Sequence, residues 1–205
     1  MKTQNLVLFD MDGTLVDSMD RIFHSVCRVF VSQGVKPPTF ETYLLTFGFP
    51  YEKWYWDLGV KLSSEEIWKI YSREHGEYNP PFFHDALTEI HKLRETNFRP
   101  IIVTANSCEN VLKVLKLVDL ADLIECKSAS DKSKAIGELV KESALGERTP
   151  YVGDIVADMA DARKAGARPV AILRNGMMRL AQEYHDAGAS ICINSLSHLT
   201  KVVLR

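Results

Sequence analysis

The sequence contains no apolar run that approaches the roughly 20 residues needed for a membrane-spanning helix. Its first short apolar run ends at Asp10 and is followed by no small-residue cleavage site, so we expect no signal peptide. The 25 basic and 27 acidic residues leave a net charge of −2, which gives no basic excess for a nucleic-acid-binding surface. We therefore expect a cytoplasmic protein that binds neither membranes nor nucleic acid.

Cysteine and histidine are sparse and too scattered to form a recognisable metal-binding motif. The four cysteines include no C-x-x-C pair, and the six histidines include no H-E-x-x-H motif and no two residues four positions apart. This spacing argues against a zinc site and against a disulfide framework. We expect each cysteine to be a small apolar residue in a reducing compartment. They are Cys27, Cys108, Cys126 and Cys192.

Short apolar segments alternate with helical patterns through most of the chain. The segments are rich in valine and isoleucine without polar alternation, which is typical of strands buried on both faces. The expected strands are Leu6–Phe9, Pro100–Thr104, Leu123–Glu125, Thr149–Gly153, Pro169–Leu173 and Ser190–Ile193. The expected helices are Asp85–Thr96, Cys108–Lys116, Lys132–Ser143, Ala157–Ala165, Met178–Ala187 and Leu196–Leu204. This alternation predicts an α/β fold, a Rossmann-like parallel sheet with helices on both faces.

The region after the first strand breaks this rhythm, because it contains only helical patterns. These patterns cover Asp17–Gln33, Phe40–Phe47, Tyr51–Leu58 and Ser64–His75. We therefore predict an all-helical insertion, residues 16–81, in an α/β core formed by residues 1–15 and 82–205. The insertion carries all three tryptophans. We expect them to pack in its core or at a domain interface, and the alternative is a surface that faces a substrate.

Acidic side chains follow two of the predicted strands at the point where each strand ends. Asp10 and Asp12 follow the first strand, and Asp154 and Asp158 follow the strand that ends at Gly153. Ligands of open parallel sheets bind outside the carboxyl ends of the strands. We therefore expect these carboxylates to converge on one edge of the sheet, together with the hydroxyl of Thr104.

Three interpretations of the Asp10–Asp12 pair compete. An EF-hand calcium loop starting at Asp10 would need glycine and glutamate where this chain has Leu15 and Arg21, so that interpretation fails. A plain Asp-Gly turn accounts for Asp12 but leaves Asp10 and the second acidic cluster unexplained. The third interpretation is chemical: gathered carboxylates need a divalent cation, and hard oxygen ligands select Mg²⁺, which usually serves phosphate.

Four sequence segments extend this chemical interpretation. They are DMDGT at 10–14, IIVTAN at 101–106, DKSKAI at 131–136 and VGDIVAD at 152–158. Together they resemble the four motifs of the haloacid dehalogenase-like (HAD) hydrolase superfamily, most closely its phosphoglycolate phosphatase-like members, which have a helical cap after the first motif. The resemblance covers the full chain, and four motifs in order are far more specific than any one of them.

The resemblance implies a role for each residue that matches a motif. Asp10 looks like a nucleophile and Mg²⁺ ligand, and Asp12 like the general acid/base, with its backbone carbonyl on the same ion. Asp154 looks like a further Mg²⁺ ligand, and Asp158 like a supporting acidic residue that orients the motif lysine. Two residues, Thr104 and Lys132, resemble those that hold the phosphoryl group, and the phosphate pocket would also be shaped by Gly13, Thr14, Ala105 and Asn106.

The third motif departs from the pattern of many capped members, which have Lys-Pro-x-Pro where this chain has Asp-Lys-Ser-Lys. We favour Lys132 as the motif lysine because it opens a helix with a core-facing apolar side. Lys134 and Lys127 are the rivals, and each is otherwise a solvated surface charge. The segment Arg174-Asn175-Gly176, after the fifth predicted strand, is a candidate to approach the cleft, but we assign it no role.

The resemblance favours phosphoryl transfer, because members that cleave carbon–halogen bonds need no proton donor at the position of Asp12. The expected activity is hydrolysis of a small phosphorylated metabolite through an aspartyl phosphate. A phosphomutase of the same superfamily is the alternative, and a non-enzymatic phosphoacceptor is a weaker one. Neither the substrate nor the oligomeric state can be read from the sequence.

Overall fold

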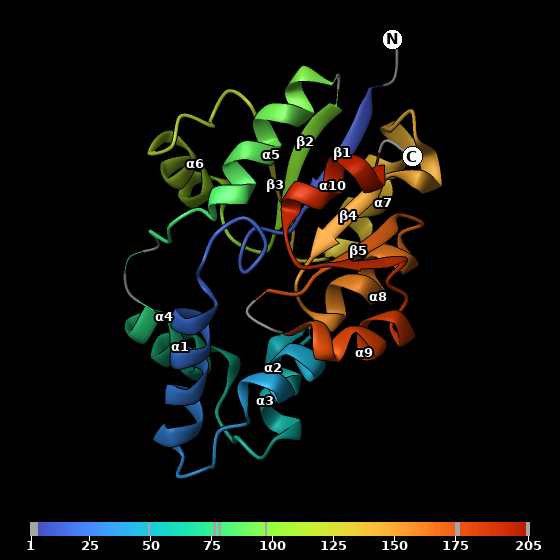
Figure 1. The fold of residues 1–205 in the computed structure, drawn as a ribbon. Coiled ribbons are helices and arrows are strands. Elements are labelled where there is room, and N and C mark those ends of the chain that lie inside the picture. The colour runs from blue at the N-terminus through green and yellow to red at the C-terminus, as the bar shows by residue number, and fades with distance from the viewer. Residues whose placement is uncertain are drawn as a thin grey trace. The chain divides into compact units, whose positions relative to one another are not determined.

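The computed structural model describes residues 4–48, 50–75, 77, 79–96, 98–174 and 177–203. The chain forms two compact units, one made of Met1–Asp17 and Pro80–Arg205 and the other of Ser18–Asn79 (Figure 1). The predicted insertion, residues 16–81, differs from the second unit by two residues at each end. Within the described residues, no helix is both long enough and apolar enough to cross a membrane.

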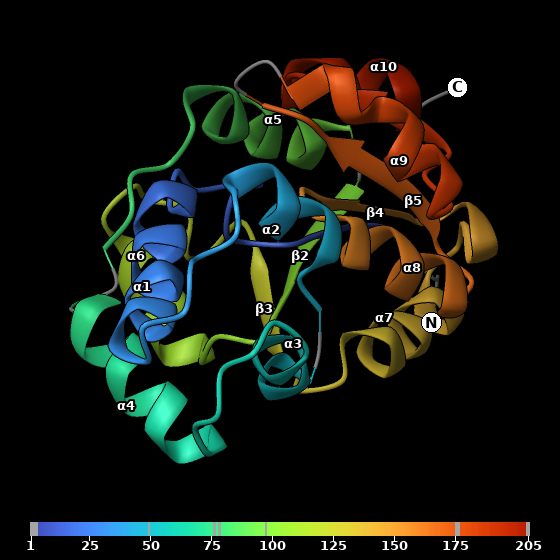
Figure 2. The same ribbon diagram turned by 90° about the horizontal axis from the view of Figure 1, so that it is seen from below.

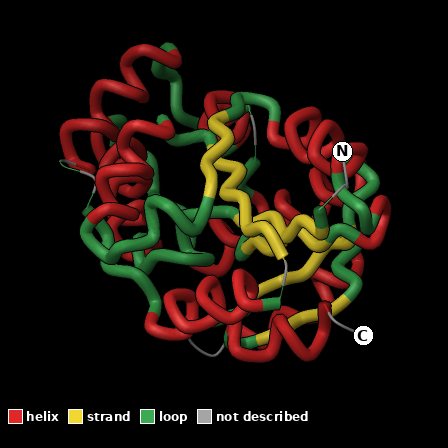
Figure 3. The backbone as a smooth tube through the Cα atoms, turned by 90° about the horizontal axis from the view of Figure 1, so that it is seen from above, coloured by secondary structure: helices red, strands yellow, loops and turns green. Residues whose placement is uncertain are grey.

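The described residues of the first unit form a six-stranded sheet in which every neighbouring pair is parallel. Figure 3 shows the strands in yellow. The strand order is β3-β2-β1-β4-β5-β6, so the order reverses direction at β1. Such a reversal opens a crevice at the carboxyl ends of the two central strands, here β1 and β4. The strands are β1 Asn5–Phe9, β2 Phe98–Thr104, β3 Glu125–Ser128, β4 Pro150–Gly153, β5 Arg168–Ile172 and β6 Ile191–Ile193.

Helices cover both faces of this sheet, as the alternating pattern predicted (Figure 2). α7 and α8 lie on one face, and α5 and α10 on the other. The helices of this unit are α5 His84–Glu95, α6 Cys108–Lys116, α7 Lys132–Glu142, α8 Val156–Lys164, α9 Ala181–Asp186 and α10 Leu199–Val203. Three short 3₁₀ segments join them, η1 Gly146–Arg148, η2 Met177–Leu180 and η3 Leu196–His198.

The apolar core between the sheet and the helices α7 and α8 determines the direction of the side chains of β1. Leu6 and Leu8 of β1 are buried with apolar side chains of both helices, including Ile136 and Ala162. Successive side chains of a strand point to opposite faces, so Asp10 continues the side that carries Leu6 and Leu8. The packing of β1 therefore directs Asp10 toward α7.

Two strand predictions need correction. The third strand is Glu125–Ser128 rather than Leu123–Glu125, because Leu123 and Ile124 donate backbone hydrogen bonds back to Leu120 and form a turn. β2 begins at Phe98, two residues before the predicted start. Pro100 fits inside it because β3 pairs with β2 only from Ile101 onward, so no β3 partner needs the N–H that proline lacks.

The cysteine prediction is also wrong, because Cys108 and Cys126 form a disulfide with Cα atoms 5.7 Å apart. Their separation of 18 residues gives no recognisable spacing motif. The β2–α6–β3 crossover brings them together by placing the start of α6 beside β3. Cys27 and Cys192 remain free thiols.

The described residues of the second unit form the helices α1 Met19–Ser32, α2 Phe40–Thr46, α3 Tyr51–Asp57 and α4 Ser64–His75. Its buried centre is aromatic: the ring of Trp54 lies 5.7 Å from Phe30 and 5.8 Å from Tyr43. Trp56 and Trp68, in contrast, are 48% and 58% exposed, so neither packs in the core of this unit. The expected domain interface and the alternative, a substrate-facing surface, stay predictions for these two residues.

Candidate active site

The site forms where β1 and β4 end. The backbone N–H of Asp10 donates to the carbonyl of Val152 at 2.8 Å, which ties the residue after β1 to β4. β4 ends at Gly153, so Asp154 leaves the sheet beside Asp10. The predicted convergence at the carboxyl edge of the sheet is thus present in the structure.

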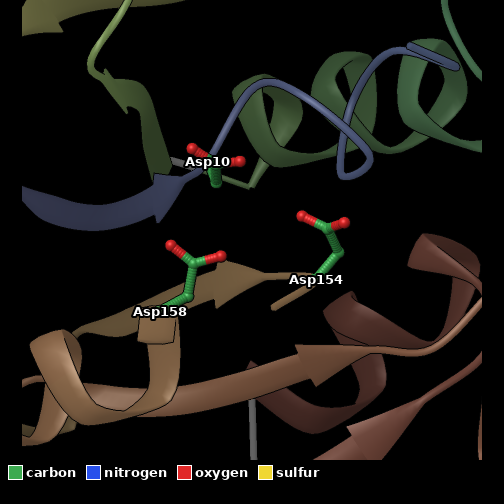
Figure 4. Close-up of side chains that lie close together, drawn as sticks. All are labelled: Asp10, Asp154 and Asp158. Atoms are coloured by element: carbon green, nitrogen blue, oxygen red, sulfur yellow. The ribbon is translucent and has the colours of Figure 1, made fainter. Parts of the chain in front are cut away.

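Three buried carboxylates face one another at this point (Figure 4). Asp10, Asp154 and Asp158 each offer one oxygen, and these three oxygens lie within 4.8 Å of one another. Asp10 and Asp154 come from strand ends, and Asp158 comes from the first turn of α8. A spacing of this kind suits a single metal ion with oxygen ligands.

Lys132 is the lysine that reaches this cluster. It opens α7, where Asp131 caps the helix by accepting from the N–H of Lys134 at 3.0 Å. The buried Nζ of Lys132 donates to Asp10 at 2.6 Å and to Asp158 at 3.1 Å. Of its two rivals, Lys127 pairs with Glu138 on the surface and Lys134 is exposed.

Asp158 is held by groups that leave it little capacity for a metal. Besides Lys132, its carboxylate accepts hydrogen bonds from the hydroxyl of Tyr151 at 3.1 Å and from the N–H of Ile155 at 3.3 Å. Gly153 makes this placement possible, because a Cβ there would lie 2.5 Å from an Asp158 carboxylate oxygen. These contacts suit the supporting role that the sequence predicted for Asp158.

Asp154 keeps more of its oxygen lone pairs available than Asp158. Among the described residues, its side chain accepts a single long hydrogen bond of 3.5 Å, from the hydroxyl of Thr14. Its backbone carbonyl accepts a 2.6 Å bond from the hydroxyl of Tyr184, a buried residue of α9. The main chain of Asp154 is therefore fixed while its carboxylate faces the cluster.

The phosphate loop predicted after β2 lies at the start of α6. The buried hydroxyl of Thr104 accepts from the N–H of Asn106 at 3.1 Å, and Ser107 caps α6 by accepting from the N–H of Asn110. Ala105 is exposed between them. A helix N-terminus next to a hydroxyl is a favourable place for phosphoryl oxygens.

The loop that carries Asp12 closes on itself. The N–H groups of Leu15 and Val16 donate to the carbonyl of Met11 at 3.0 and 3.2 Å, and Gly13 donates to Val16 at 2.9 Å. Gly13 has a φ of 74°, which other residues seldom adopt. Asp12 is partly buried on this loop, two positions beyond Asp10.

The charges of the cluster do not balance by themselves. Burial raises the pKa of Asp10 to about 7, because the attraction of Lys132 is offset by desolvation and by repulsion from Asp158 and Asp12. Burial, together with repulsion from Asp10 and Asp158, raises the pKa of Asp154 as well. One lysine therefore does not neutralise three buried carboxylates, and the donor set fits a divalent cation.

Three residues for which we predicted no role, Tyr151, Tyr184 and Arg174, lie around the site. The two tyrosines reach Asp158 and Asp154 through their hydroxyl groups. Arg174 donates to the backbone carbonyl of Thr14, next to the Asp12 loop. The one signal for the tyrosines in the sequence is their residue type, because the hydroxyl of a buried tyrosine usually forms a hydrogen bond. Asn175 and Gly176 lie outside the described residues.

Comparison with known proteins identifies the family. The sequence pattern of the haloacid dehalogenase-like hydrolases matches residues 7–172, which include all four motifs. The chain belongs to this family. A curated protein of Caldanaerobacter subterraneus subsp. tengcongensis, named "Putative pyrophosphatase PpaX", is 30% identical over 185 residues, which cover 81% of this chain and 80% of that protein.

Two solved structures share the fold of this chain. A predicted phosphatase from Clostridium acetobutylicum superimposes with a TM-score of 0.75 at 19% identity, covering 99% of both chains. A "Putative beta-phosphoglucomutase" from Bacteroides vulgatus superimposes with a TM-score of 0.74 at 17% identity, covering 98% of this chain and 88% of the other. At these identities the similarity concerns the fold alone.

Proposed function

We propose that this HAD-like protein is a Mg²⁺-dependent phosphatase that hydrolyses small phosphate monoesters through an aspartyl phosphate on Asp10. The observation that carries the proposal is the placement of Asp10: a buried carboxylate at the end of a central strand, 2.6 Å from a buried lysine and beside two further carboxylates. A carboxylate has little value for packing there, and desolvation makes it costly. Such a cost is typical of functional sites.

In the first step, the free carboxylate oxygen of Asp10 attacks phosphorus, and the bond between phosphorus and the ester oxygen breaks. Asp12, protonated, gives its proton to the departing alkoxide, so the alcohol leaves neutral. Lys132 holds the other oxygen of Asp10 and fixes the direction of attack. Thr104 and the N–H groups at the start of α6 bind the phosphoryl oxygens.

In the second step, Asp12 takes a proton from water as that water attacks phosphorus, and the bond to Asp10 breaks. Inorganic phosphate leaves and both carboxyl groups return to their starting state. Asp10, Asp154 and the backbone carbonyl of Asp12 would hold Mg²⁺. The bound ion supplies positive charge that offsets the phosphoryl oxygens and the carboxylate excess.

A phosphomutase of the same superfamily is the alternative, because it would use the same aspartyl phosphate and pass the group to a sugar hydroxyl. A non-enzymatic phosphoacceptor is the weaker alternative. The name of the curated relative supports adding pyrophosphate, a phosphoanhydride, to the substrates that are tried.

The test is hydrolysis of p-nitrophenyl phosphate by the wild type and by Asp10→Asn, with Mg²⁺ and with EDTA. We expect turnover with Mg²⁺ only, and no turnover by Asp10→Asn. Asp161→Asn is the matched control, because Asp161 lies one turn after Asp158 on α8 but outside the cluster. It should stay within about threefold of the wild type.

Each other result contradicts a distinct part of the proposal. Undiminished turnover by Asp10→Asn excludes Asp10 as the nucleophile, and full turnover in EDTA excludes the metal. Failure of the wild type on aryl phosphates, sugar phosphates and pyrophosphate alike favours the phosphoacceptor. Transfer to a sugar hydroxyl in place of release as phosphate favours the phosphomutase.

A further inference from the structure

A second polar cluster lies in the same unit, and its charged side chains belong to none of the four motifs. Its centre is the bidentate pair of Arg174 and Asp85, in which two guanidinium nitrogens each donate to a carboxylate oxygen at 3.1 Å. Asp85 also accepts from the hydroxyl of Ser195 at 2.8 Å and from the N–H of Leu196 at 2.9 Å. The pair is largely buried, with side-chain exposures of 13% and 20%. Geometry of this kind fixes the orientation of a guanidinium.

Arg174 uses this fixed orientation to hold the loop that follows Asp12. Its Nη2 donates to the backbone carbonyl of Thr14 at 2.9 Å. Thr14 lies within the closed loop of Met11 to Val16, and its hydroxyl reaches Asp154 at 3.5 Å. A shift of the Thr14 carbonyl would therefore move the peptide that carries Asp12.

The same side chain also holds the segment by which the chain returns to this unit. The guanidinium of Arg174 lies 3.7 Å from the ring centre of Phe83, a cation–π contact. Phe83 donates its N–H to the carbonyl of Leu15 at 2.9 Å, and Asp17 donates to Pro81 at 2.8 Å. The outgoing and returning segments thus run side by side, and Arg174 contacts both.

We propose that Arg174, oriented by Asp85, is a positioning residue that holds the Asp12 loop where Asp12 can protonate the leaving group. The proposal rests on the phosphatase function proposed above. Arg174 touches neither the three carboxylates nor the phosphate loop by any described contact, so its effect on catalysis passes through the loop. Lysine cannot replace Arg174, because a single ammonium group cannot donate to both oxygens of Asp85 and to the Thr14 carbonyl with the planar geometry of a guanidinium.

The first test measures dependence on the leaving group. Phenyl phosphate and p-nitrophenyl phosphate differ by one nitro group, and phenolate needs a proton on departure far more than nitrophenolate does. Arg174→Met and Arg174→Lys should each lose about tenfold more kcat/KM on phenyl phosphate than on p-nitrophenyl phosphate, as the loss of a charged hydrogen bond would give. Asp12→Asn should show the same selectivity in a stronger form.

The matched control is Arg99→Met, which breaks another bidentate arginine–carboxylate pair in the same unit. Arg99 pairs with Glu125 at the opposite, amino end of β2. This variant should lose equally little on both esters. Equal losses on the two esters in Arg174→Met and Arg174→Lys would overturn the positioning role, since a purely structural role lowers both rates together.

The second test needs no activity. Amide hydrogen exchange in a peptide covering residues 10–17 should become about tenfold faster in Arg174→Met, with a peptide from α7 unchanged and Arg99→Met like the wild type. Unchanged exchange in that peptide overturns the inference. If the wild type hydrolyses neither these esters nor the sugar phosphates and pyrophosphate tried above, the function proposed above fails, and hydrogen exchange still decides whether Arg174 holds the loop.

Discussion

Asp10 and Asp85 are both carboxylates beside a basic side chain in the same unit, yet their surroundings shift their pKa values in opposite directions. Burial and neighbouring carboxylates raise the pKa of Asp10 to about 7 in spite of Lys132. Burial acts against ionisation of Asp85 too, but hydrogen bonds from Arg174, Ser195 and Leu196 outweigh it and lower its pKa. The two carboxylates differ in their hydrogen-bond and charge partners. Asp10 shares the ammonium group of Lys132 with another carboxylate, whereas Asp85 accepts hydrogen bonds from one guanidinium and from two further donors.

This contrast separates a site arranged for chemistry from a site arranged for structure. The crowded carboxylates of the Asp10 cluster lower the stability of the folded protein, and a loss of stability of this kind is common at active sites. The Asp85 cluster satisfies its charge with short, directed bonds. Substitutions at the two places should therefore have opposite consequences for stability.

The largest expected effect is that of Asp10→Asn on activity. Removing the nucleophile should lower kcat for p-nitrophenyl phosphate by more than about a thousandfold. The same change removes one of three crowded carboxylates, so the Tm of the metal-free protein should stay equal or rise. Steady-state kinetics and calorimetry in EDTA measure the two effects. A large fall in Tm with loss of activity would mean that Asp10 is structural.

The next effect is that of Lys132→Met on stability. The substitution leaves the carboxylates without their cation, and removal of one partner of a buried pair costs about 3 kcal/mol. Chemical denaturation measures this loss, and Lys134→Met is the matched control on the same turn of α7, since that lysine is exposed. If the two variants are equally stable, Lys132 does not hold the cluster together.

A smaller effect is expected for Asp85→Asn. Arg174 keeps one acceptor but loses the charge of its partner, and the free energy of unfolding should fall by about 1–2 kcal/mol. Asp57→Asn provides the control, because the exposed pair of Asp57 with Lys53 should contribute less than about 0.5 kcal/mol. A rise in stability, as expected for Asp10→Asn, would remove the contrast between the two clusters.

The smallest effect is a difference in pH dependence, measured by denaturation in EDTA. The folded pKa of Asp10 is raised, so its ionisation destabilises the fold as pH rises from about 4 through about 7. The stability of Asp10→Asn relative to the wild type should therefore grow over that window. The folded pKa of Asp85 is lowered, so its contribution is complete above about 4 and is lost only as pH falls below that value. The deficit of Asp85→Asn should therefore stay constant between pH 5 and 8, and a deficit that varies there would contradict this assignment.

The two clusters also differ in how far the sequence predicts them. Asp10 and Asp154 each follow an apolar strand and Thr104 ends another, so the parallel order of the strands is enough to place all three at the same edge of the sheet. Lys132 could be chosen over its rivals only by its place at a helix start. Arg174 and Asp85 are 89 residues apart, and nothing local to either indicates the other. Their pairing depends on how α5 and the end of β5 pack.

The other differences between prediction and structure have two causes, long-range packing and reliance on hydrophobicity. The disulfide of Cys108 and Cys126 depends on a crossover that places α6 beside β3, which spacing alone does not reveal. The third strand begins later than the apolar residues Leu123 and Ile124 suggest, because these two residues form a turn. Trp56 and Trp68 are exposed in their unit, because hydrophobicity alone does not distinguish a core position from a surface that faces another domain or a ligand.

The most direct test of the central claim is to trap the phosphorylated enzyme. During turnover of p-nitrophenyl phosphate, rapid acid quenching followed by borohydride reduction converts an aspartyl phosphate to homoserine, and mass spectrometry of the peptides locates it. We predict homoserine at position 10 and at no other aspartate. Turnover without homoserine at position 10, or with homoserine at Asp12, Asp154 or Asp158 instead, would contradict the assignment of Asp10 as the nucleophile.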